Sequence, residues 1–213
     1  MRVAAFVVLA GQGTRVKGGR RRIPRCFHLT LVARPLTLIP WAVPISPYIR
    51  ELRAAVGTRR LLIPSVAGIV RDGERILLVQ ERESGLWSTP GGALELDDTP
   101  ANAVIREVYE ETDLVVEPTR IFGVYGGPEF IVRYGNGDET QYVSTMFECR
   151  VVSGEIKPDG DEILVARFWT TDEALELPLS PWLTRMIARL YERKSEAWFE
   201  EPTWQPSQGS RAL

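Results

Sequence analysis

Three glutamates, Glu107, Glu110 and Glu111, have the spacing that places side chains together on one face of an α-helix. Three like charges on a single turn repel one another, so the helix gains no stability from them alone. A hard divalent cation would remove that repulsion, because Mg²⁺ and Mn²⁺ prefer carboxylate oxygens as ligands. The spacing therefore indicates a candidate metal site.

A glycine turn, Pro90-Gly91-Gly92, precedes this acidic stretch. Adjacent glycines let the backbone approach a ligand closely or adopt a positive φ. The phosphate-binding loop of the GxxxxGK[ST] type uses a lysine, which this turn lacks. A glycine turn beside an acidic helix face suits a metal-bound phosphate better than a bare anion. These residues suggest metal-assisted chemistry on a phosphate ester or anhydride.

The acidic residues require a helix to position them, and the sequence predicts one from Ala101 to Thr112. Thr99 can cap this helix, and Pro100 suits its first position, where no amide hydrogen is missed. The stretch is rich in good helix formers and has no interior Gly or Pro. Its apolar residues share one face: Ala101, Val104, Ile105 and Val108.

The stretch from Pro90 to Leu114 resembles the Nudix box, G-x5-E-x7-R-E-U-x-E-E-x-G-U, in which U is a bulky aliphatic residue. The matching positions are Gly92, Arg106, Glu107, Val108, Glu110, Glu111 and Leu114. Two positions depart from the pattern. Asp98 replaces the first glutamate, which keeps the charge but shortens the reach. Asp113 replaces the last glycine at the helix end, where a left-handed residue is common and Asp tolerates that conformation.

The resemblance implies a Mg²⁺ (or Mn²⁺) site and a fold, the α/β class with a Nudix-type α/β/α sandwich around a mixed β-sheet. By resemblance, the metal ligands are Glu107, Glu110 and Glu111, with the Gly92 carbonyl nearby. A carboxylate, Glu107 or the loop residue Glu162, would accept the proton of the attacking water. A solvated turn explains Glu162 equally well. Arg106 lies close to Glu110 on the helix, so we expect it to orient a carboxylate.

The function implied is Mg²⁺-dependent hydrolysis of the pyrophosphate bond in a nucleoside diphosphate linked to another moiety, of the ADP-ribose, nucleotide sugar or (d)NTP type. A non-catalytic Nudix-like sensor that binds a nucleotide or ADP-ribose is the alternative, prompted by Asp98 and Asp113. An isoprenoid diphosphate isomerase would need a cysteine near the site, and Cys149 is the one candidate, so we rank it last.

Three aromatic residues are candidates for substrate binding: Trp87, Tyr125 and Phe130. Tyr125 and Phe130 could stack on a base, although strand aromatics more often belong to a core. Packing beside the site is the favoured interpretation of Trp87. Pro128 lies fourteen residues beyond Leu114, and ADP-ribose pyrophosphatases resemble this chain in carrying a proline at such a distance. The Gly-Gly-Pro turn explains Pro128 equally well.

The composition narrows the chemistry further. The apolar content of 44% can supply a normal core. Cys26 and Cys149 are the only cysteines, which argues against a disulfide framework or a cysteine zinc site. His28 is the only histidine, so mechanisms that use a catalytic histidine or a histidine-bound metal are disfavoured. Any catalytic base is expected to be a carboxylate.

Charge is distributed unevenly along the 213 residues. The first 50 residues hold nine Lys or Arg and no acid, whereas the remainder holds 17 basic and 28 acidic residues. We therefore expect a basic, disordered N-terminal extension (1–44), a Nudix hydrolase domain (45–196) and a flexible C-terminal tail (197–213). The shift in charge also fits a native product that starts near Val43.

The acidic main domain suits a small phosphorylated substrate that arrives with its cation, and it does not indicate nucleic-acid binding. Leu29 to Ile45 is apolar but interrupted by Arg34 and three prolines, which makes it a poor membrane span. We expect a cytoplasmic protein whose partner is a small nucleoside diphosphate derivative. The sequence leaves a homodimer open.

Overall fold

The computed structural model describes residues 46–192, 194–200 and 202–203. The expectations for residues 1–44 and for most of the C-terminal tail lie outside these residues. The elements in chain order are α1 (Pro47–Val56), β1 (Leu61–Asp72), β2 (Arg75–Glu81), β3 (Trp87–Ser88), β4 (Gly91–Ala93), α2 (Pro100–Thr112), β5 (Val115–Tyr125), the 3-10 helix η1 (Pro128–Phe130), β6 (Ile131–Arg133), β7 (Glu139–Ser153), β8 (Ile163–Trp169), α3 (Thr171–Leu175) and α4 (Pro181–Tyr191).

A mixed β-sheet forms the centre of the fold, with strand order β3-β2-β1-β7-β5. β4 pairs with β1, β6 with β7, and β8 with β2. β1 and β7 run parallel, and the other pairs are antiparallel. The central strand β1 is continuously buried from Ser65 to Val70, because both faces of the sheet are covered there.

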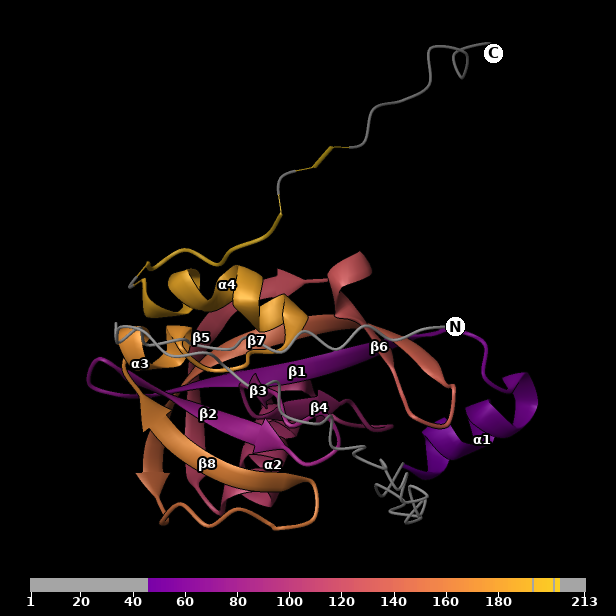
Figure 1. The fold of residues 1–213 in the computed structure, drawn as a ribbon, viewed down its shortest axis with the longest axis horizontal. Coiled ribbons are helices and arrows are strands. Elements are labelled where there is room, and N and C mark those ends of the chain that lie inside the picture. Colours follow the sequence, from indigo (N-terminus) through magenta and orange to yellow (C-terminus); the bar gives the residue numbers. More distant parts are fainter. Residues whose placement is uncertain (1–45, 193, 201, 204–213) are drawn as a thin grey trace, which may run out of the picture. The chain divides into compact units, whose positions relative to one another are not determined.

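Helices cover the two faces of this sheet, with α2 on one face and α3 and α4 on the other (Figure 1). Val104 and Val108 of α2 pack in one core with Leu77 and Phe147. The opposite core contains Leu183, Met186 and Leu190 of α4. The predicted α/β/α sandwich around a mixed sheet is confirmed.

Helix α2 approaches the sheet closely at Gly68 of β1. A β-carbon at Gly68 would lie 2.8 Å from Val108 Cγ2 and 3.4 Å from Val104 Cγ2. The first distance is much shorter than ordinary van der Waals contact between carbons, and the second is at the lower edge of that range. The missing side chain at Gly68 therefore sets how near the acidic helix lies to the sheet.

The edge strand β5 runs from Val115 to Tyr125. Pro118 lies within it, and the register with β7 shifts between Pro118 and Arg120. Proline is tolerated at such edges and bulges because its lost amide hydrogen is not required there. Phe130, which we predicted in a strand, lies instead in η1.

One residue of the C-terminal segment, Trp198, is bonded to the sheet through its backbone. Trp198 N donates to Phe122 O at 2.9 Å, and Val124 N donates to Trp198 O at 3.0 Å. Trp198 thus forms a bridge with Gly123 on the open edge of β5. Residues near 198 are held by the sheet through these two backbone bonds.

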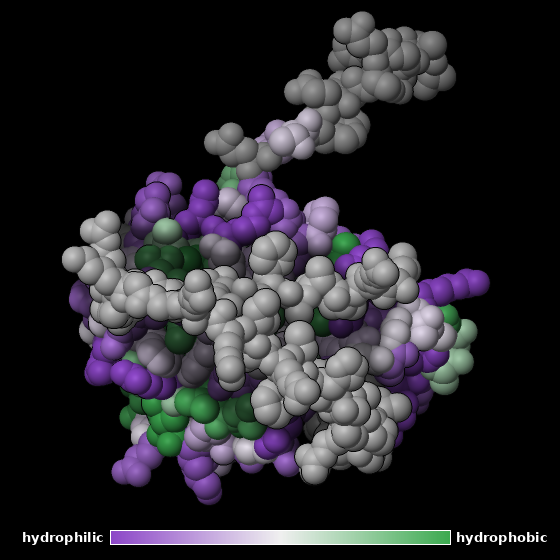
Figure 2. Space-filling model, in the orientation of Figure 1, coloured by the Kyte–Doolittle hydropathy of each residue, from purple (hydrophilic) through white to green (hydrophobic). Residues whose placement is uncertain are grey.

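The surface shown in Figure 2 is largely hydrophilic where residues are coloured, with an apolar patch at the lower left, where Figure 1 places β8. Leu164 and Val165 of β8 are each 41% exposed. Within the described residues, no helix is long and apolar enough to cross a membrane.

Candidate active site

Helix α2 has well-defined ends that fix the orientation of its acidic face. Thr99 Oγ1 accepts a hydrogen bond from Asn102 N at 3.3 Å, and Pro100 occupies the first turn. Asp113 ends the helix in the left-handed conformation, with φ 61°, and its N–H donates to Tyr109 O at 2.8 Å. The non-glycine residue therefore performs the capping function predicted for this position.

Arg106 is bonded to three carboxylates at once. Its guanidinium nitrogens lie 2.9 Å from Asp98 Oδ2, 2.8 Å from Glu107 Oε1 and 3.1 Å from Glu110 Oε2. Ala93 O accepts a further hydrogen bond at 3.4 Å. Arg106 thus contacts three carboxylates, and Asp98 reaches it despite being one methylene shorter than glutamate.

Glu111 is the buried member of the acidic face, with 8% exposure. Its Oε1 accepts a hydrogen bond from Gly91 N at 3.3 Å, which joins the helix to the glycine turn. Its Oε2 is buried and has no hydrogen-bond partner among the described residues. Burial, followed by repulsion from Glu107, raises the pKa of Glu111 well above its usual value.

Glu107 lies directly against the glycine turn. A β-carbon at Gly92 would be 2.5 Å from Glu107 Oε2, so the glycine leaves the space that this carboxylate occupies. Burial raises the pKa of Glu107 to about 7, and Arg106 opposes this shift by favouring the charged form. Glu110 is more open, with a side chain that is 57% exposed.

Glu162 and Glu81 complete an acidic cluster from the other side. Glu162 raises the pKa of both Glu107 and Glu111 by like-charge repulsion, and its own pKa is raised mainly by burial. Glu81 lies next to it because Glu81 of β2 pairs with Ile163 of β8. Burial also raises the pKa of Glu81, and its charge acts on Glu111.

Glu81 was not among the site residues predicted from the sequence. An acid at the end of an apolar strand was the available signal, but only the β2–β8 pairing brings it to the cluster. The acidic cluster is defined here as Glu81, Glu107, Glu110, Glu111 and Glu162.

The acidic cluster fits a divalent cation in its donor chemistry. Among the described residues, no group of three His, Cys, Asp or Glu side chains is already arranged to hold an ion. However, Glu111 Oε2 is a buried carboxylate oxygen without a hydrogen-bond partner in that part of the chain. Such an oxygen is costly to bury alone, and a cation would compensate for it.

The three aromatic candidates lie away from the acids, on the sheet face covered by α4. Trp87 is 6% exposed and packs edge-to-face on Trp169, with ring centroids 5.1 Å apart. Its environment fits packing. Tyr125 and Phe130 stack with ring centroids 6.2 Å apart and line a pocket under α4. Sequence reasoning missed Trp182 and Trp198, which complete that pocket.

Comparison with known proteins identifies the family. A family model described as the NUDIX domain matches residues 61–190. The chain belongs to the Nudix family. The matched range contains the whole Nudix box and the acidic cluster, while α1 and Trp198 lie outside it.

Individual relatives agree with this identification. The chain is similar to a MutT-like protein of Streptomyces ambofaciens, with 34% identity over 127 residues that cover 59% of this chain and 75% of the relative. It is 33% identical over 116 residues to an ADP-ribose pyrophosphatase of Methanocaldococcus jannaschii, covering 52% of this chain and 64% of the relative.

A solved structure named as an ADP-ribose pyrophosphatase from Streptococcus suis superposes with a TM-score of 0.52 at 25% identity. It covers 63% of this chain and 96% of the other. This Nudix chain is a hydrolase of the class that acts on phosphoric anhydrides.

Proposed function

We propose that this Nudix hydrolase uses Mg²⁺ or Mn²⁺ to cleave the pyrophosphate bond of a nucleoside diphosphate linked to another moiety. The observation that carries the proposal is the buried oxygen Glu111 Oε2, which has no hydrogen-bond partner in the described residues, on a side chain that three further glutamates, Glu107, Glu162 and Glu81, repel. A cluster of this kind lowers the stability of the fold and is retained where it binds a cation.

Glu107, Glu110 and Glu111, with the backbone carbonyl of Gly92, are the residues that would hold the metal. When bound, the metal neutralises phosphate oxygens and lowers the pKa of a coordinated water. Arg106 keeps Glu107 and Glu110 in position through its ion pairs. The Gly91 amide performs the same function for Glu111.

A carboxylate of the cluster would accept the proton from the attacking water, and the candidates are Glu107 and Glu162. Glu107 is engaged by Arg106 at 2.8 Å, which stabilises its charged form. Glu162 is half-buried at the start of β8 and is held through its backbone, where Glu162 O accepts from Arg82 N at 2.8 Å. Glu162→Gln assayed at saturating metal would identify the base, because it should lose turnover if Glu162 accepts the proton and retain turnover if Glu107 does.

ADP-ribose is the first substrate to test, because two of the similar proteins are named ADP-ribose pyrophosphatases. Nucleotide sugars and (d)NTPs remain in the proposed substrate class. We propose that Tyr125 and Phe130 contact the base. Trp87 supports the region by packing on Trp169, in accordance with its burial.

The test is a panel assay of ADP-ribose, nucleotide sugars, nucleoside triphosphates and dinucleoside polyphosphates with Mg²⁺ or Mn²⁺. The wild type is compared with Glu111→Gln and with Glu117→Gln, a control that changes an exposed carboxylate of β5 paired with Arg150. We expect metal-dependent turnover that Glu111→Gln loses and Glu117→Gln retains. Binding of ADP-ribose without turnover on the whole panel would instead support the sensor alternative.

A further inference from the structure

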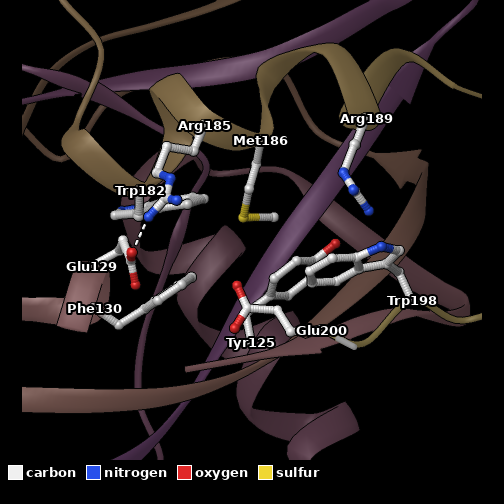
Figure 3. A pocket seen from close by; sticks show the side chains of 9 residues that line it. All are labelled: Tyr125, Glu129, Phe130, Trp182, Arg185, Met186, Arg189, Trp198 and Glu200. Carbon is white, nitrogen blue, oxygen red and sulfur yellow. Dashed lines mark hydrogen bonds and ion pairs between the residues drawn. The ribbon is translucent and has the colours of Figure 1, made fainter. Parts of the chain in front are cut away.

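A pocket of about 160 Å³ lies between α4, the end of β5 and the C-terminal segment near residue 198 (Figure 3). Four aromatic side chains line it: Tyr125, Phe130, Trp182 and Trp198. Trp198 belongs to the segment that the edge of β5 holds by backbone hydrogen bonds. The pocket thus includes a wall that the Nudix family match, residues 61–190, does not contain.

The four rings form a row of nearly parallel planes. Trp198 stacks on Tyr125 with centroids 4.7 Å apart and planes 18° apart. Tyr125 and Phe130 follow at 6.2 Å and 28°, and Phe130 and Trp182 at 5.9 Å and 26°. The rings cover part of one another's faces, so a planar ligand would pack on the ring surfaces that remain open to the pocket, where stacking tolerates any base.

Among the polar residues that line the pocket, Glu129 and Arg185 form an ion pair with each other and Glu200 lies at the C-terminal segment, which leaves Tyr125 and Arg189 as the groups considered for a ligand. The Tyr125 side chain is 2% exposed, and its hydroxyl has no hydrogen-bond partner within the described residues. A buried hydroxyl without a partner is costly, so a ligand atom that bonds to it would be favoured. Arg189 lies 4.3 Å above the Trp198 ring, and Figure 3 shows the Tyr125 hydroxyl turned toward its guanidinium.

We propose that this pocket binds the base of a nucleotide, which stacks on the aromatic row, bonds to the Tyr125 hydroxyl and presents its phosphate to Arg189. The pocket is smaller than the roughly 300–1,000 Å³ that encloses a drug-sized ligand, so it admits one ring system and leaves the phosphate at the rim. Arginine suits that position because it binds phosphate with paired hydrogen bonds.

The bound base belongs either to the substrate held at the acidic cluster or to a second nucleotide that binds separately. Tyr125, Ser144, Ser65 and Ala93 form one row of paired residues across β5, β7, β1 and β4. Three strand spacings place Tyr125 about 14 Å from Ala93, which follows the glycine turn. Binding of a base in this pocket does not depend on the proposed function. The further statement that this base belongs to the substrate rests on the proposed function.

The binding test uses the full-length protein without metal, followed by calorimetry and tryptophan fluorescence. The probes are adenosine 5′-monophosphate, adenosine and ribose 5-phosphate. We expect the monophosphate to bind most tightly, adenosine more weakly, and ribose 5-phosphate not at all. Arg189→Gln should weaken monophosphate binding about tenfold, and Tyr125→Phe about threefold or more, since each removes one hydrogen-bonding group.

Arg167→Gln is the matched control. Arg167 also lies 4.3 Å above a tryptophan, Trp169, but does not line the pocket. This variant should bind the monophosphate as the wild type does. The proposal is wrong if the wild type gives no binding signal with the monophosphate, or if both Arg189→Gln and Tyr125→Phe bind it as tightly as the wild type.

Kinetics with ADP-ribose and Mg²⁺ distinguish the two sources. If the pocket holds the substrate's base, Arg189→Gln raises KM with little change in kcat, and the monophosphate competes with substrate. If it holds a separate nucleotide, KM stays unchanged and the monophosphate does not compete. Glu111→Gln separates this inference from the proposed function, because it should lose turnover yet bind the monophosphate as the wild type does.

Discussion

Asp98 Oδ2 lies 2.9 Å from Arg106 Nη2, so a carboxylate before helix α2 is tied to the arginine that positions the metal-site glutamates. The ion pair is a quarter exposed on each side, which limits its contribution to stability to about 1 kcal/mol. The ion pair should matter more for the orientation of the Arg106 side chain, because Arg106 also binds the carboxylates of Glu107 and Glu110.

We therefore expect Asp98→Asn to lower turnover several-fold while moving the melting temperature by only a few degrees. Asp98→Glu should retain activity, since it restores the glutamate of the Nudix box. Steady-state kinetics with thermal melts measures both quantities. Equal turnover in Asp98→Asn and the wild type would show that Arg106 keeps its orientation without the ion pair to Asp98.

Glu111→Gln should uncouple metal binding from stability. The amide retains an oxygen that can accept from Gly91 N but carries no charge to attract a cation. We expect Mg²⁺ to raise the melting temperature of the wild type and not of the variant. Without metal the variant should be at least as stable, because it relieves repulsion with Glu107.

Turnover of Glu111→Gln should fall by roughly 10²–10⁴, the range for one well-placed catalytic group. Glu107→Gln should behave similarly when turnover is measured against Mg²⁺ concentration. If both variants gave the metal response of the wild type, α2 would not be the active site.

Gly68→Ala should destabilise the fold by about 1–3 kcal/mol, the usual range for an overpacked core. Its new methyl group would lie 2.8 Å from Val108 Cγ2, so helix α2 must shift away from β1. Activity should fall with stability, because the same helix carries the glutamates. The double variant Gly68→Ala/Val108→Ala relieves that contact. Urea unfolding of the wild type, the two single variants and the double variant should therefore give a favourable coupling energy between the two positions.

Arg53→Ala should detach helix α1, none of whose residues is buried. Arg53 Nη2 donates to Glu139 O at 2.7 Å and Thr140 Oγ1 at 2.8 Å, and its Nη1 donates to Arg59 O at 2.7 Å. Loss of these bonds should cost about 2–4 kcal/mol and allow proteolysis near α1. Arg60→Ala removes an exposed partner of the same Glu139 and should change stability by less than about 1 kcal/mol.

Asp113→Gly should stabilise the protein by about 0.5–1 kcal/mol. Asp113 has φ 61°, a conformation that costs a residue with a β-carbon more than it costs glycine. The side chain of Asp113 has no described role in the acidic cluster, so kcat and KM should stay at wild-type values. Thermal melts at one metal concentration test this, and a lower melting temperature would contradict it.

The sequence predicted α2 and its glutamates well because their geometry depends on local spacing. The helix begins at Pro100 and ends at Thr112, within a residue of the prediction. Glu81 was not predicted as a member of the acidic cluster, because only the pairing of β2 with β8 brings it beside Glu162.

Trp198 was predicted in the flexible tail. Its pairing with β5 was not predicted, because no local sequence pattern indicates that a single residue will pair with a distant strand edge. Its partner, Gly123, lies 75 residues earlier in the chain. The wall that it adds to the aromatic pocket was therefore beyond sequence reasoning as well.

The parallel pairing of β1 with β7 has a consequence for synthesis of the chain on the ribosome. Leu61 lies opposite Thr140 and Arg71 opposite Arg150, so each pair closes a loop of about 80 residues. The edge of the apolar β1 strand that pairs with β7 therefore stays unpaired until the second half of the domain has left the ribosome. Such non-local closure makes folding slow, and an unpaired strand edge is a site where nascent chains associate. Chaperone demand should therefore be highest just before β7 leaves the exit tunnel.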